Sequence, residues 1–295
     1  MTEPIRVAVR RGEIVECVHE VHAVAVREGA IVAEAGDPSL AASLRSSAKP
    51  LQALPLARAY ENLRDDELAI AAASHFGTPE HVEAVRRLLA STGGSEHELE
   101  CGLQDGRPPE PVFHNCSGKH AAMIAACRVH GWPVDGYRQP DHPLQLALQE
   151  EVAAAAELEA DEVSTGPDGC GVVCFGLPLE RAALAFSRLA ELEGGAQIAA
   201  AMRAHPVLIG GDGATDTDLM RAQPEWLAKA GAEGLMCAAS TSGVGVGVKV
   251  ADGNSRALRP ALAAFGAGLG LDLPDFQEVP LRNWHGEPAG TVALL

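Results

Sequence analysis

Arg45-Ser46-Ser47-Ala48-Lys49-Pro50 places a serine and a lysine three residues apart. On a helix, residues at this spacing lie on the same face. A neutral lysine amine could then take the proton of the Ser46 hydroxyl and make this serine a nucleophile. Pro50 fits a first helical turn but disfavours helical geometry at Lys49, so we expect Ser46 at the start of a helix. The free N–H groups of such a start could also bind an oxyanion.

Lysine is scarce in this chain. Among 23 Lys and Arg residues only four are lysines, namely Lys49, Lys119, Lys229 and Lys249. Arginine stays protonated, whereas a buried lysine loses its proton readily, so the few lysines are candidates for functional amines. Three of them lie in stretches of small residues. We interpret the fourth, Lys229 in Trp-Leu-Ala-Lys-Ala-Gly, as an ordinary cation at a helix end.

Composition limits the classes of function. The chain has 295 residues and a net charge of −17, which makes nucleic acid or an anionic membrane an unfavourable partner. The first residues lack a signal-peptide pattern, and no apolar run reaches the ~18 residues of a membrane span. We therefore expect a cytoplasmic protein, in which the seven cysteines are thiols, metal ligands or core residues and not disulfides.

Strand-like alternation appears near both ends of the chain, and helical patterns fill the middle. The expected strands cover residues 5–9, 14–18, 23–26, 31–33, 235–239 and 244–250, with edge strands at 279–282 and 291–294. No linker or repeat divides the chain, so residues 1–295 are expected to form one domain with an inserted helical region. The arrangement resembles the serine β-lactamase architecture, an α/β fold whose antiparallel sheet comes from both chain ends with helices between and beside it.

Three further motifs could carry chemistry. Ser74 follows a small apolar run and precedes a helix that begins at Thr78 and Pro79, so it lies on a short connection where functional residues often occur. Cys116 and Lys119 are three apart at a helix start, where the helix dipole and a cation favour a thiolate. Glycines flank Cys170 in Asp168-Gly-Cys-Gly and would allow its backbone to approach a ligand closely.

Two other groups look like metal sites at first reading. Cys17, His19 and His22 are typical ligands, but they alternate with apolar residues, so a strand surface is the better interpretation. The loop Gly210-Gly-Asp-Gly-Ala-Thr-Asp-Thr-Asp218 is rich in Asp. It lacks the ligand spacing and the closing Glu of an EF-hand, and we reject calcium binding.

Together these motifs resemble one family, the rhizobial-type L-asparaginases, which form the third structural class (asparaginase II). The resemblance rests on the segments around Ser46, Ser74, Cys116, Cys170 and Lys249, and it covers nearly the whole chain in order. It implies a β-lactamase- and glutaminase-like fold and a homodimer. The sequence departs from the family near Ala214, where a bulkier basic residue is usual, and this departure could alter affinity or assembly.

The resemblance also implies the site residues. Two serine–lysine tandems would be Ser46 with Lys49 and Ser74 with Lys249. One zinc ion per subunit, not necessarily essential for the chemistry, would be held by Cys116, Lys119 and Cys170, and zinc accepts thiolates readily. Residues that would bind the charged α-groups of the substrate are Arg45, His120 and Asp168.

These inferences favour hydrolysis of the side-chain amide of L-asparagine to L-aspartate and ammonia through an acyl-enzyme, with Ser46 attacking and Lys49 accepting its proton. Ser74 and Lys249 would relay protons, and the roles of the two pairs could be exchanged. One alternative is another serine acylase of this fold, such as a glutaminase, β-lactamase or peptidase. Against a β-lactamase, no Ser-Asp-Asn or Lys-Thr-Gly follows, and Lys249 precedes Val250. The other alternative is a non-catalytic zinc-binding sensor.

Overall fold

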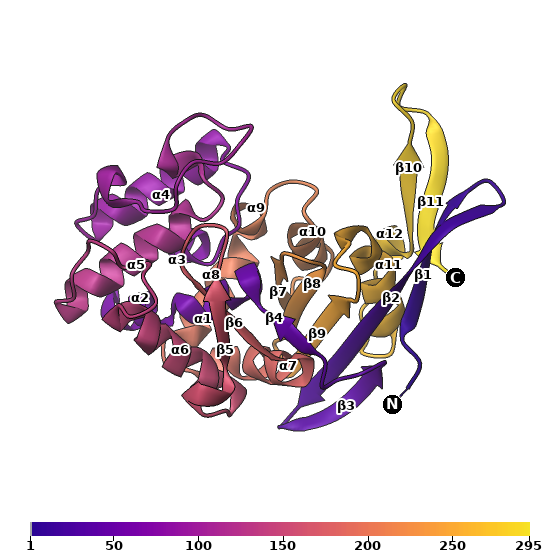
Figure 1. Ribbon diagram of the computed structural model, residues 1–295, viewed down its shortest axis with the longest axis horizontal. Helices are drawn as coiled ribbons and strands as arrows, with labels where there is room; N and C mark the ends of the chain where they lie inside the picture. Colours follow the sequence, from indigo (N-terminus) through magenta and orange to yellow (C-terminus); the bar gives the residue numbers. More distant parts are fainter. Residues whose placement is uncertain (1) are drawn as a thin grey trace.

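An antiparallel sheet of eight strands forms one half of the computed structural model, which describes residues 2–295. The strand order is β10-β11-β1-β2-β9-β8-β7, and β3 pairs with the second half of β2. Their bounds are β1 Ile5–Arg11, β2 Ile14–Arg27, β3 Ala30–Ala35, β7 Trp226–Gly231, β8 Leu235–Ser240, β9 Val244–Val250, β10 Glu278–Arg282 and β11 Pro288–Leu294. Strands from the two chain ends therefore lie side by side, which confirms the predicted sheet (Figure 1).

Two details of the strand prediction were wrong. We expected separate strands at 14–18 and 23–26, but β2 runs without a break because no turn-forming residue lies between Val18 and Ala23. We also expected residues 291–294 at an edge. Only β10 is an edge strand there, and β11 lies inside the sheet between β10 and β1.

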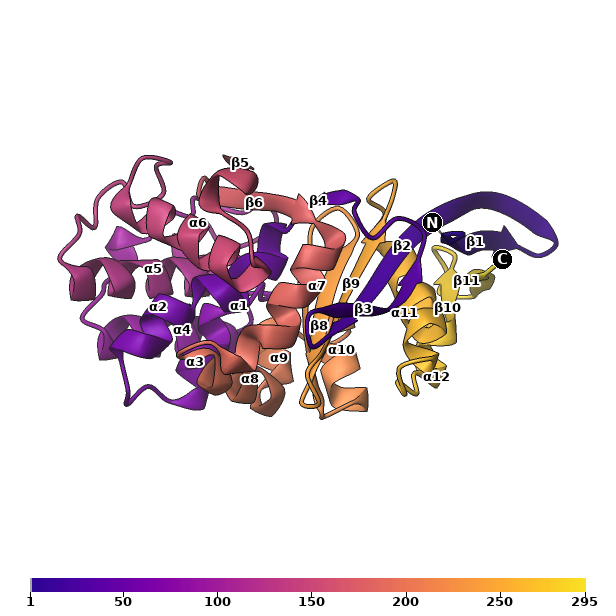
Figure 2. The same ribbon diagram turned by 90° about the horizontal axis from the view of Figure 1, so that it is seen from below.

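Helices fill the middle of the chain and cover both faces of the sheet (Figure 2). In Figure 2, α7 lies on one side of the strands and α10, α11 and α12 lie on the other, while α1 to α6 gather beside the sheet. Their bounds are α1 Lys49–Gln52, α2 Leu54–Ala59, α3 Asp65–Ala71, α4 Pro79–Ser91, α5 Ser117–His130, α6 Pro143–Ala156, α7 Leu179–Arg188, α8 Gly195–Ala204, α9 Pro206–Ile209, α10 Thr215–Ala222, α11 Leu258–Ala267 and α12 Pro274–Gln277. Short 3₁₀ helices are η1 Arg45–Ala48, η2 Glu96–Glu98, η3 Pro111–Phe113, η4 Ala160–Glu162, η5 Leu189–Glu191 and η6 Ser255–Ala257.

Two prolines divide the helix that we expected after the Ser46 motif. Pro50 and Pro55 each occupy the first turn of their own helix, α1 and α2, where the missing N–H costs nothing. Lys49 nevertheless has helical backbone angles, φ −58° and ψ −38°, so our expectation that Pro50 would disfavour helical geometry there was wrong.

Glycines on β9 let α7 lie directly on the sheet. A Cβ at Gly245 would come within 2.0 Å of the Ala183 carbonyl oxygen, and one at Gly247 within 2.9 Å of a Leu179 methyl group. The glycines that alternate with valine in Val244-Gly-Val-Gly-Val therefore mark the face of the strand that α7 covers.

A second, three-stranded sheet positions two of the motifs. Its order is β4 (Ala41–Ser43), β6 (Val173–Pro178) and β5 (Ser164–Pro167). The chain leaves β4 directly into the Ser46 turn, and it leaves β5 directly into Asp168-Gly-Cys170. The backbone N–H of Leu44 donates to the carbonyl of Phe175 at 2.7 Å, which fixes this approach. Motifs more than 120 residues apart in sequence thus meet at one end of this small sheet.

Candidate active site

The turn that carries Ser46 rests on strand β7. Ser47 is completely buried, and its hydroxyl donates to the carbonyl of Lys229 at 2.9 Å. Gly231 ends β7 beneath the turn, where a Cβ would lie 2.7 Å from the Leu44 carbonyl oxygen. The Ser46 turn is therefore held against β7, the edge strand of the main sheet. Ser46 lies at the start of a helical segment, η1, as predicted.

Arg45 has an unusual backbone conformation. Its φ of +45° lies in the left-handed region, which a residue with a side chain adopts only at a cost of about 1–3 kcal/mol. The conformation is held by an ion pair of 2.7 Å between Arg45 Nε and Asp168 Oδ1. Burial alone would raise the pKa of Asp168, but Lys119 and Arg45 hold that pKa below its ordinary value. The structure thus brings two of the three predicted substrate-binding residues together.

Lys49 is fully buried at the centre of the site. Its ammonium donates to the carbonyls of Ala73 at 2.6 Å and Asn115 at 3.4 Å, and lies 2.9 Å from Ser74 Oγ. Burial is the largest cause that lowers the pKa of Lys49 to about 8; Lys119 and Lys229 add to the lowering, and Cys116 opposes it. About a tenth of Lys49 is therefore neutral at pH 7, and a neutral amine can accept a proton from a serine hydroxyl.

The predicted pairing of Ser74 with Lys249 is not formed. Lys249 lies on β9, paired with His22 of β2, and its ammonium donates to the carbonyl of Val250 at 2.5 Å. Among residues 2–295 it makes no hydrogen bond to either predicted catalytic serine. The reason is topological, because β8 separates β9 from β7, the strand on which the Ser46 turn rests.

Lys229 takes the place at the site that we expected for Lys249. It lies on β7 and is fully buried, so our interpretation of it as a helix-end cation was wrong. Its ammonium is 3.2 Å from Asp216 Oδ2 and donates to the Ala230 carbonyl at 2.8 Å, and the Ala230 N–H donates to the same Asp216 oxygen at 3.0 Å. A sequence signal exists: Lys229-Ala-Gly231 resembles the strand motif Lys-Thr-Gly, with alanine in place of threonine.

Asp216 was also missed. It belongs to the loop at 210–218 that departs from the family pattern, and it is buried at the start of α10. Nothing local in the sequence distinguishes it from Asp212 or Asp218, whose side chains pair with Arg221 and Arg259 instead. Only the fold shows that one aspartate of this cluster points inward.

Ser46 lies one helical turn before Lys49, with which it should share a face. It is half-buried, and its hydroxyl makes no hydrogen bond to another residue of the described chain. It therefore differs from Ser74, whose hydroxyl is already engaged by Lys49. One hydroxyl is free and the other is bonded to the buried amine.

The predicted metal-binding residues do meet. Gly118 allows α5 to begin against the end of α3, because a Cβ there would lie 2.0 Å from the Ile70 carbonyl oxygen. This contact carries Cys116 and Lys119 to Cys170, with 3.1 Å between Lys119 Nζ and Cys170 Sγ. All three side chains are buried.

Charges in this cluster are strongly coupled. A hydrogen bond from the Cys170 thiol lowers the pKa of Cys116 well below its ordinary value, while the same bond and burial raise the pKa of Cys170. Burial alone would lower the pKa of Lys119, but Cys116, Cys170 and Asp168 raise it. Within residues 2–295, no group of three His, Cys, Asp or Glu side chains is placed to hold a metal ion. A metal here would have two sulfur donors and would need the Lys119 amine as its third.

His120 makes no hydrogen bond or ion pair to Arg45 or Asp168 within residues 2–295. It is completely buried, and its Nδ1 is 2.6 Å from the hydroxyl of Tyr137. Burial, together with the charge of Lys119, lowers the pKa of His120 well below its ordinary value. Its Nε2 has no hydrogen-bond partner among the described residues. The structure therefore gives His120 a core position.

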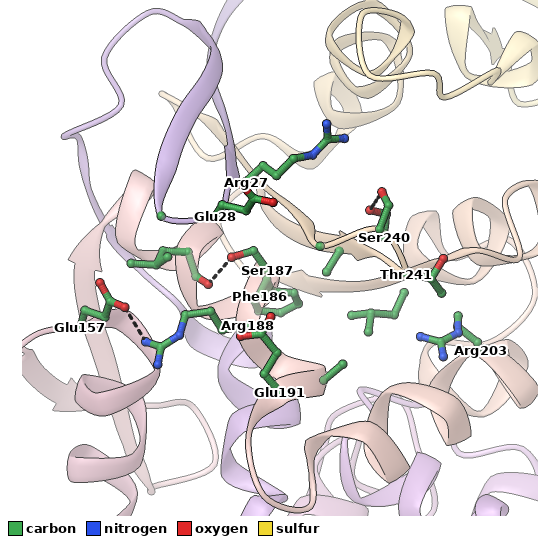
Figure 3. A pocket seen from close by; sticks show the side chains of 17 residues that line it. Arg27, Glu28, Glu157, Phe186, Ser187, Arg188, Glu191, Arg203, Ser240 and Thr241 are labelled. Carbon is green, nitrogen blue, oxygen red and sulfur yellow. Dashed lines mark hydrogen bonds and ion pairs between the residues drawn. The ribbon is translucent and has the colours of Figure 1, made fainter.

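A cavity of about 840 Å³ lies elsewhere, between α7, α8 and the β8–β9 turn (Figure 3). Arg188, paired with Glu157 at 3.1 Å, lies on its wall, as do Arg27 and Arg203. The cavity is lined by Leu227 near the start of β7 and by Ser240 at the end of β8. It therefore lies at the opposite end of these strands from Gly231, beside which the Ser46 turn packs. None of the predicted catalytic residues lines this cavity, so it does not locate the chemistry.

Comparison with known proteins agrees with this geometry. A family model described as L-asparaginase II matches residues 7–294, while a search of curated proteins found no match. A crystal structure of Mglu in its native form has 14% identity and a TM-score of 0.50 over 86% of this chain and 66% of that chain. Native Mglu in 4.3 M NaCl has 13% identity and a TM-score of 0.49 over 86% of this chain and 62% of that chain. A Bacillus glutaminase in 4.3 M NaCl has 13% identity and a TM-score of 0.40 over 86% of this chain and 92% of that chain.

The chain spans less than two thirds of these Mglu chains. At such low identity the likeness to native Mglu shows the fold alone, and it agrees with the antiparallel sheet and flanking helices described above. The fold class predicted from the sequence is confirmed.

The buried pair of Lys229 and Asp216 gives a stability prediction. Asp216→Asn leaves the Lys229 ammonium without its counter-charge and should lower the free energy of unfolding by about 3–5 kcal/mol. Asp212→Asn is the matched control. The Asp212 side chain is 78% exposed, and its partner Arg221 is also exposed. Exposed ion pairs of this kind contribute about 0–1 kcal/mol to stability. Urea unfolding of both variants measures the difference, and equal midpoints would contradict the assignment.

Proposed function

The chain belongs to the L-asparaginase II family, and on this premise we propose that it hydrolyses the side-chain amide of L-asparagine to L-aspartate and ammonia. Membership supports an amidohydrolase, and the choice of asparagine over glutamine is a further step of the proposal. The observation that carries the proposed chemistry is the buried amine of Lys49, which lies 2.9 Å from Ser74 Oγ and one helical turn from Ser46.

In the proposed reaction Ser46 Oγ attacks the amide carbon while Lys49, in its neutral form, accepts the hydroxyl proton. Lys49 passes a proton through Ser74 to the amide nitrogen, which leaves as ammonia and yields an acyl-enzyme on Ser46. Water then attacks the ester carbon, Ser74 and Lys49 carry one of its protons to Ser46 Oγ, and the ester C–O bond breaks to release aspartate. We assign the attack to Ser46 because its hydroxyl is free, whereas that of Ser74 is positioned as a relay.

Arg45 and Asp168 fit the charged α-groups of an amino-acid substrate. Arg45 would bind the α-carboxylate, for which its planar guanidinium is suited, and Asp168 would bind the α-ammonium. The proposal does not include His120, because its ring is fully buried and bonded to Tyr137. Lys229 replaces Lys249 as the third lysine of the site, since its charge helps to keep the pKa of Lys49 low.

We propose zinc at Cys116, Lys119 and Cys170. The donor chemistry fits, because Cys116 has a lowered pKa and a second thiol and a lysine amine lie beside it. Lys119 must lose its proton before it can bind a metal. When bound, the ion would act as a Lewis acid that fixes these side chains and, through them, Asp168. The amide hydrolysis described above proceeds on Ser46, Lys49 and Ser74.

We also propose a homodimer. Two hairpins, β1–β2 and β10–β11, project beyond the sheet (Figure 1). They expose Ile14 at 68% and Trp284 completely, and exposed apolar side chains of this size favour a protein contact. Light scattering after gel filtration should give twice the mass of 30.6 kDa, and Trp284→Ser with Ile14→Ser should shift the protein toward a single chain. A wild-type monomer would refute this proposal.

Ammonia release from L-asparagine and from L-glutamine tests the activity. The wild type should act on asparagine, and Ser46→Ala should lower kcat/KM by roughly 10³-fold or more, since it removes the nucleophile. Ser74→Ala should lower kcat by about 10²–10⁴-fold, the usual contribution of general acid–base catalysis. Ser43→Ala, an exposed serine two residues before Arg45, should keep wild-type activity.

Mass spectrometry separates the two serines. Acid quenching of the wild type during turnover should trap a β-aspartyl ester on the peptide that contains Ser46. An ester on Ser74 in the Ser46→Ala variant would exchange the two roles. Folded protein that releases no ammonia from either amide, but hydrolyses a chromogenic cephalosporin, would sink the asparaginase proposal in favour of the β-lactamase alternative.

The pKa of Lys49 predicts a pH dependence. Only neutral Lys49 can accept a proton, so kcat/KM should rise with pH through a midpoint at about 8, the pKa to which burial lowers this amine. Lys49→Arg should be inactive throughout, because arginine stays protonated. A rate that falls over this range, or a flat profile with full activity, would rule out Lys49 as the base.

Metal analysis tests the zinc proposal without reference to turnover. The purified protein should carry about one zinc per chain, and Cys170→Ser should lose most of it because a thiolate ligand is gone. Cys127→Ser, a buried cysteine elsewhere on α5, is the matched control and should retain zinc. Equal zinc content in the two variants would place the ion elsewhere or exclude it.

A further inference from the structure

Cys17 and His19 form a cluster of their own on β2. Strands β9 and β8 separate β2 from β7, the strand that carries Lys229. They lie on the same face of β2, while His22 lies on the opposite face and accepts a hydrogen bond from the backbone N–H of Asp37 at 2.9 Å. The three residues therefore cannot form one metal site. His19 is only 3% exposed, so the strand-surface interpretation was wrong for this residue.

The cluster forms where β9 leaves β2. The pairing of the two strands ends at Val250, and the chain then turns along the remaining part of β2, with the Ala251 N–H donating to the Glu20 carbonyl at 2.9 Å. This turn places the Asp252 carboxylate 2.6 Å from His19 Nδ1. In Figure 1, β2 continues past β9 into the projecting hairpin.

Arg256, which follows in η6, contacts both β2 side chains. Its Nε donates to His19 Nε2 at 2.9 Å, and its Nη2 donates to Cys17 Sγ at 3.0 Å. Cys17 Sγ is 3.6 Å from His19 Nε2. A thiol, an imidazole and a carboxylate thus stand in line, with a guanidinium bridging the first two.

These contacts fix the imidazole tautomer. An arginine side chain has only donors, so His19 Nε2 must be the acceptor of the Arg256 bond. The ring hydrogen of neutral His19 therefore lies on Nδ1 and is donated to Asp252. The Arg256 N–H takes up the single lone pair of Nε2, so His19 orients the guanidinium and does not act as a base for Cys17.

The sulfur is likewise held as an acceptor. The guanidinium N–H donates to Cys17 Sγ at 3.0 Å, so a fixed positive charge lies directly beside this sulfur. Cys17 is half-buried, so a small molecule can reach its sulfur. The geometry supplies a fixed cation and an accessible sulfur at one place.

We propose that Cys17 is a modification site that reacts with small disulfides. The Cys17 thiolate attacks one sulfur of the disulfide, the new Cys17 S–S bond forms as the old S–S bond breaks, and the second sulfur leaves with the electron pair as a thiolate. Cys17 is oxidised to a mixed disulfide, and the leaving sulfur is reduced and takes a proton from water. A second small thiol reverses the exchange.

The remaining cysteines lack this combination. Five of them are buried, and burial raises the pKa of Cys101 to about 12, of Cys127 to about 11 and of Cys237 to about 12. Cys174 is half-buried like Cys17, but within residues 2–295 the one hydrogen bond to its sulfur comes from the Ser43 hydroxyl, at 3.6 Å. Cys174 is therefore a control of similar exposure whose sulfur accepts no hydrogen bond from an arginine.

The test is timed exposure of the full-length protein to oxidised glutathione, followed by peptide mass spectrometry. One glutathionyl group should appear on Cys17 roughly tenfold faster than on Cys174, since thiolate character controls the rate of disulfide exchange. Dithiothreitol should remove it. Equal rates at the two cysteines would overturn the proposal.

Variants test whether the cluster activates the thiol. Arg256→Gln and Asp252→Asn should each slow the reaction of Cys17 measurably, by up to about tenfold, and should leave the reaction of Cys174 unchanged. Arg11→Gln, which removes a charge that pairs with Glu16 on the same hairpin, should have no effect. Both residues 252 and 256 lie on an exposed turn, and thermal unfolding checks that the variants fold. An unchanged Cys17 rate in folded Arg256→Gln would refute the role of the cluster.

Discussion

Complete burial of one lysine is the constraint on which the site depends. An ammonium out of water must find hydrogen-bond acceptors, because an unpaired buried charge is very costly. Lys49 finds three acceptors, and they come from the end of the α3 segment at Ala73 and Ser74 and from Asn115 just before α5. The position of one side chain therefore requires three separate parts of the chain to converge, and the glycine at 118 makes the last approach possible. The same burial lowers the pKa of this amine, so the feature that organises the fold also produces the base.

The sequence was informative wherever the signal was local. The alternation near both ends does mark strands, and helices begin after Thr78 and after Cys116 as predicted. The motifs around Lys49, Cys116 and Cys170 meet as expected because small residues mark places where backbones come close. The failures were of another kind. Lys229 lies in a stretch that resembles a helix end, and its burial depends on Asp216, which comes from a different element. Lys249 stands among small residues because α7 needs glycines on β9, a packing reason unrelated to catalysis.

These two lysines show why the pairing could not be found from the sequence. Strand order decides which late strand borders the Ser46 turn, and β7 and β9, which each carry one lysine and flank β8, look equivalent until the sheet is assembled. The edge position of β7 leaves its backbone and its Lys229 carbonyl next to Ser47. Such a contact spans more than 180 residues of sequence, and loop closure of this length is encoded in the packing of the whole domain and not in any single motif.

The chemistry of each cysteine in this protein is likewise determined by its neighbouring groups and its exposure. Cys116 and Cys170 lie beside a buried lysine and share a proton, which suits a metal or a fixed charge pattern sealed from solvent. Cys17 has a cation and an imidazole as well, but it lies on the outer half of β2, beyond the last residue that β9 covers. Its sulfur is the one of the three that a small molecule can approach. Because β2 is one long strand, its second half lies in the core while its first half extends beyond β9. Cys17 lies in that first half, where small molecules can reach it. The sequence pattern alone had divided this strand into two.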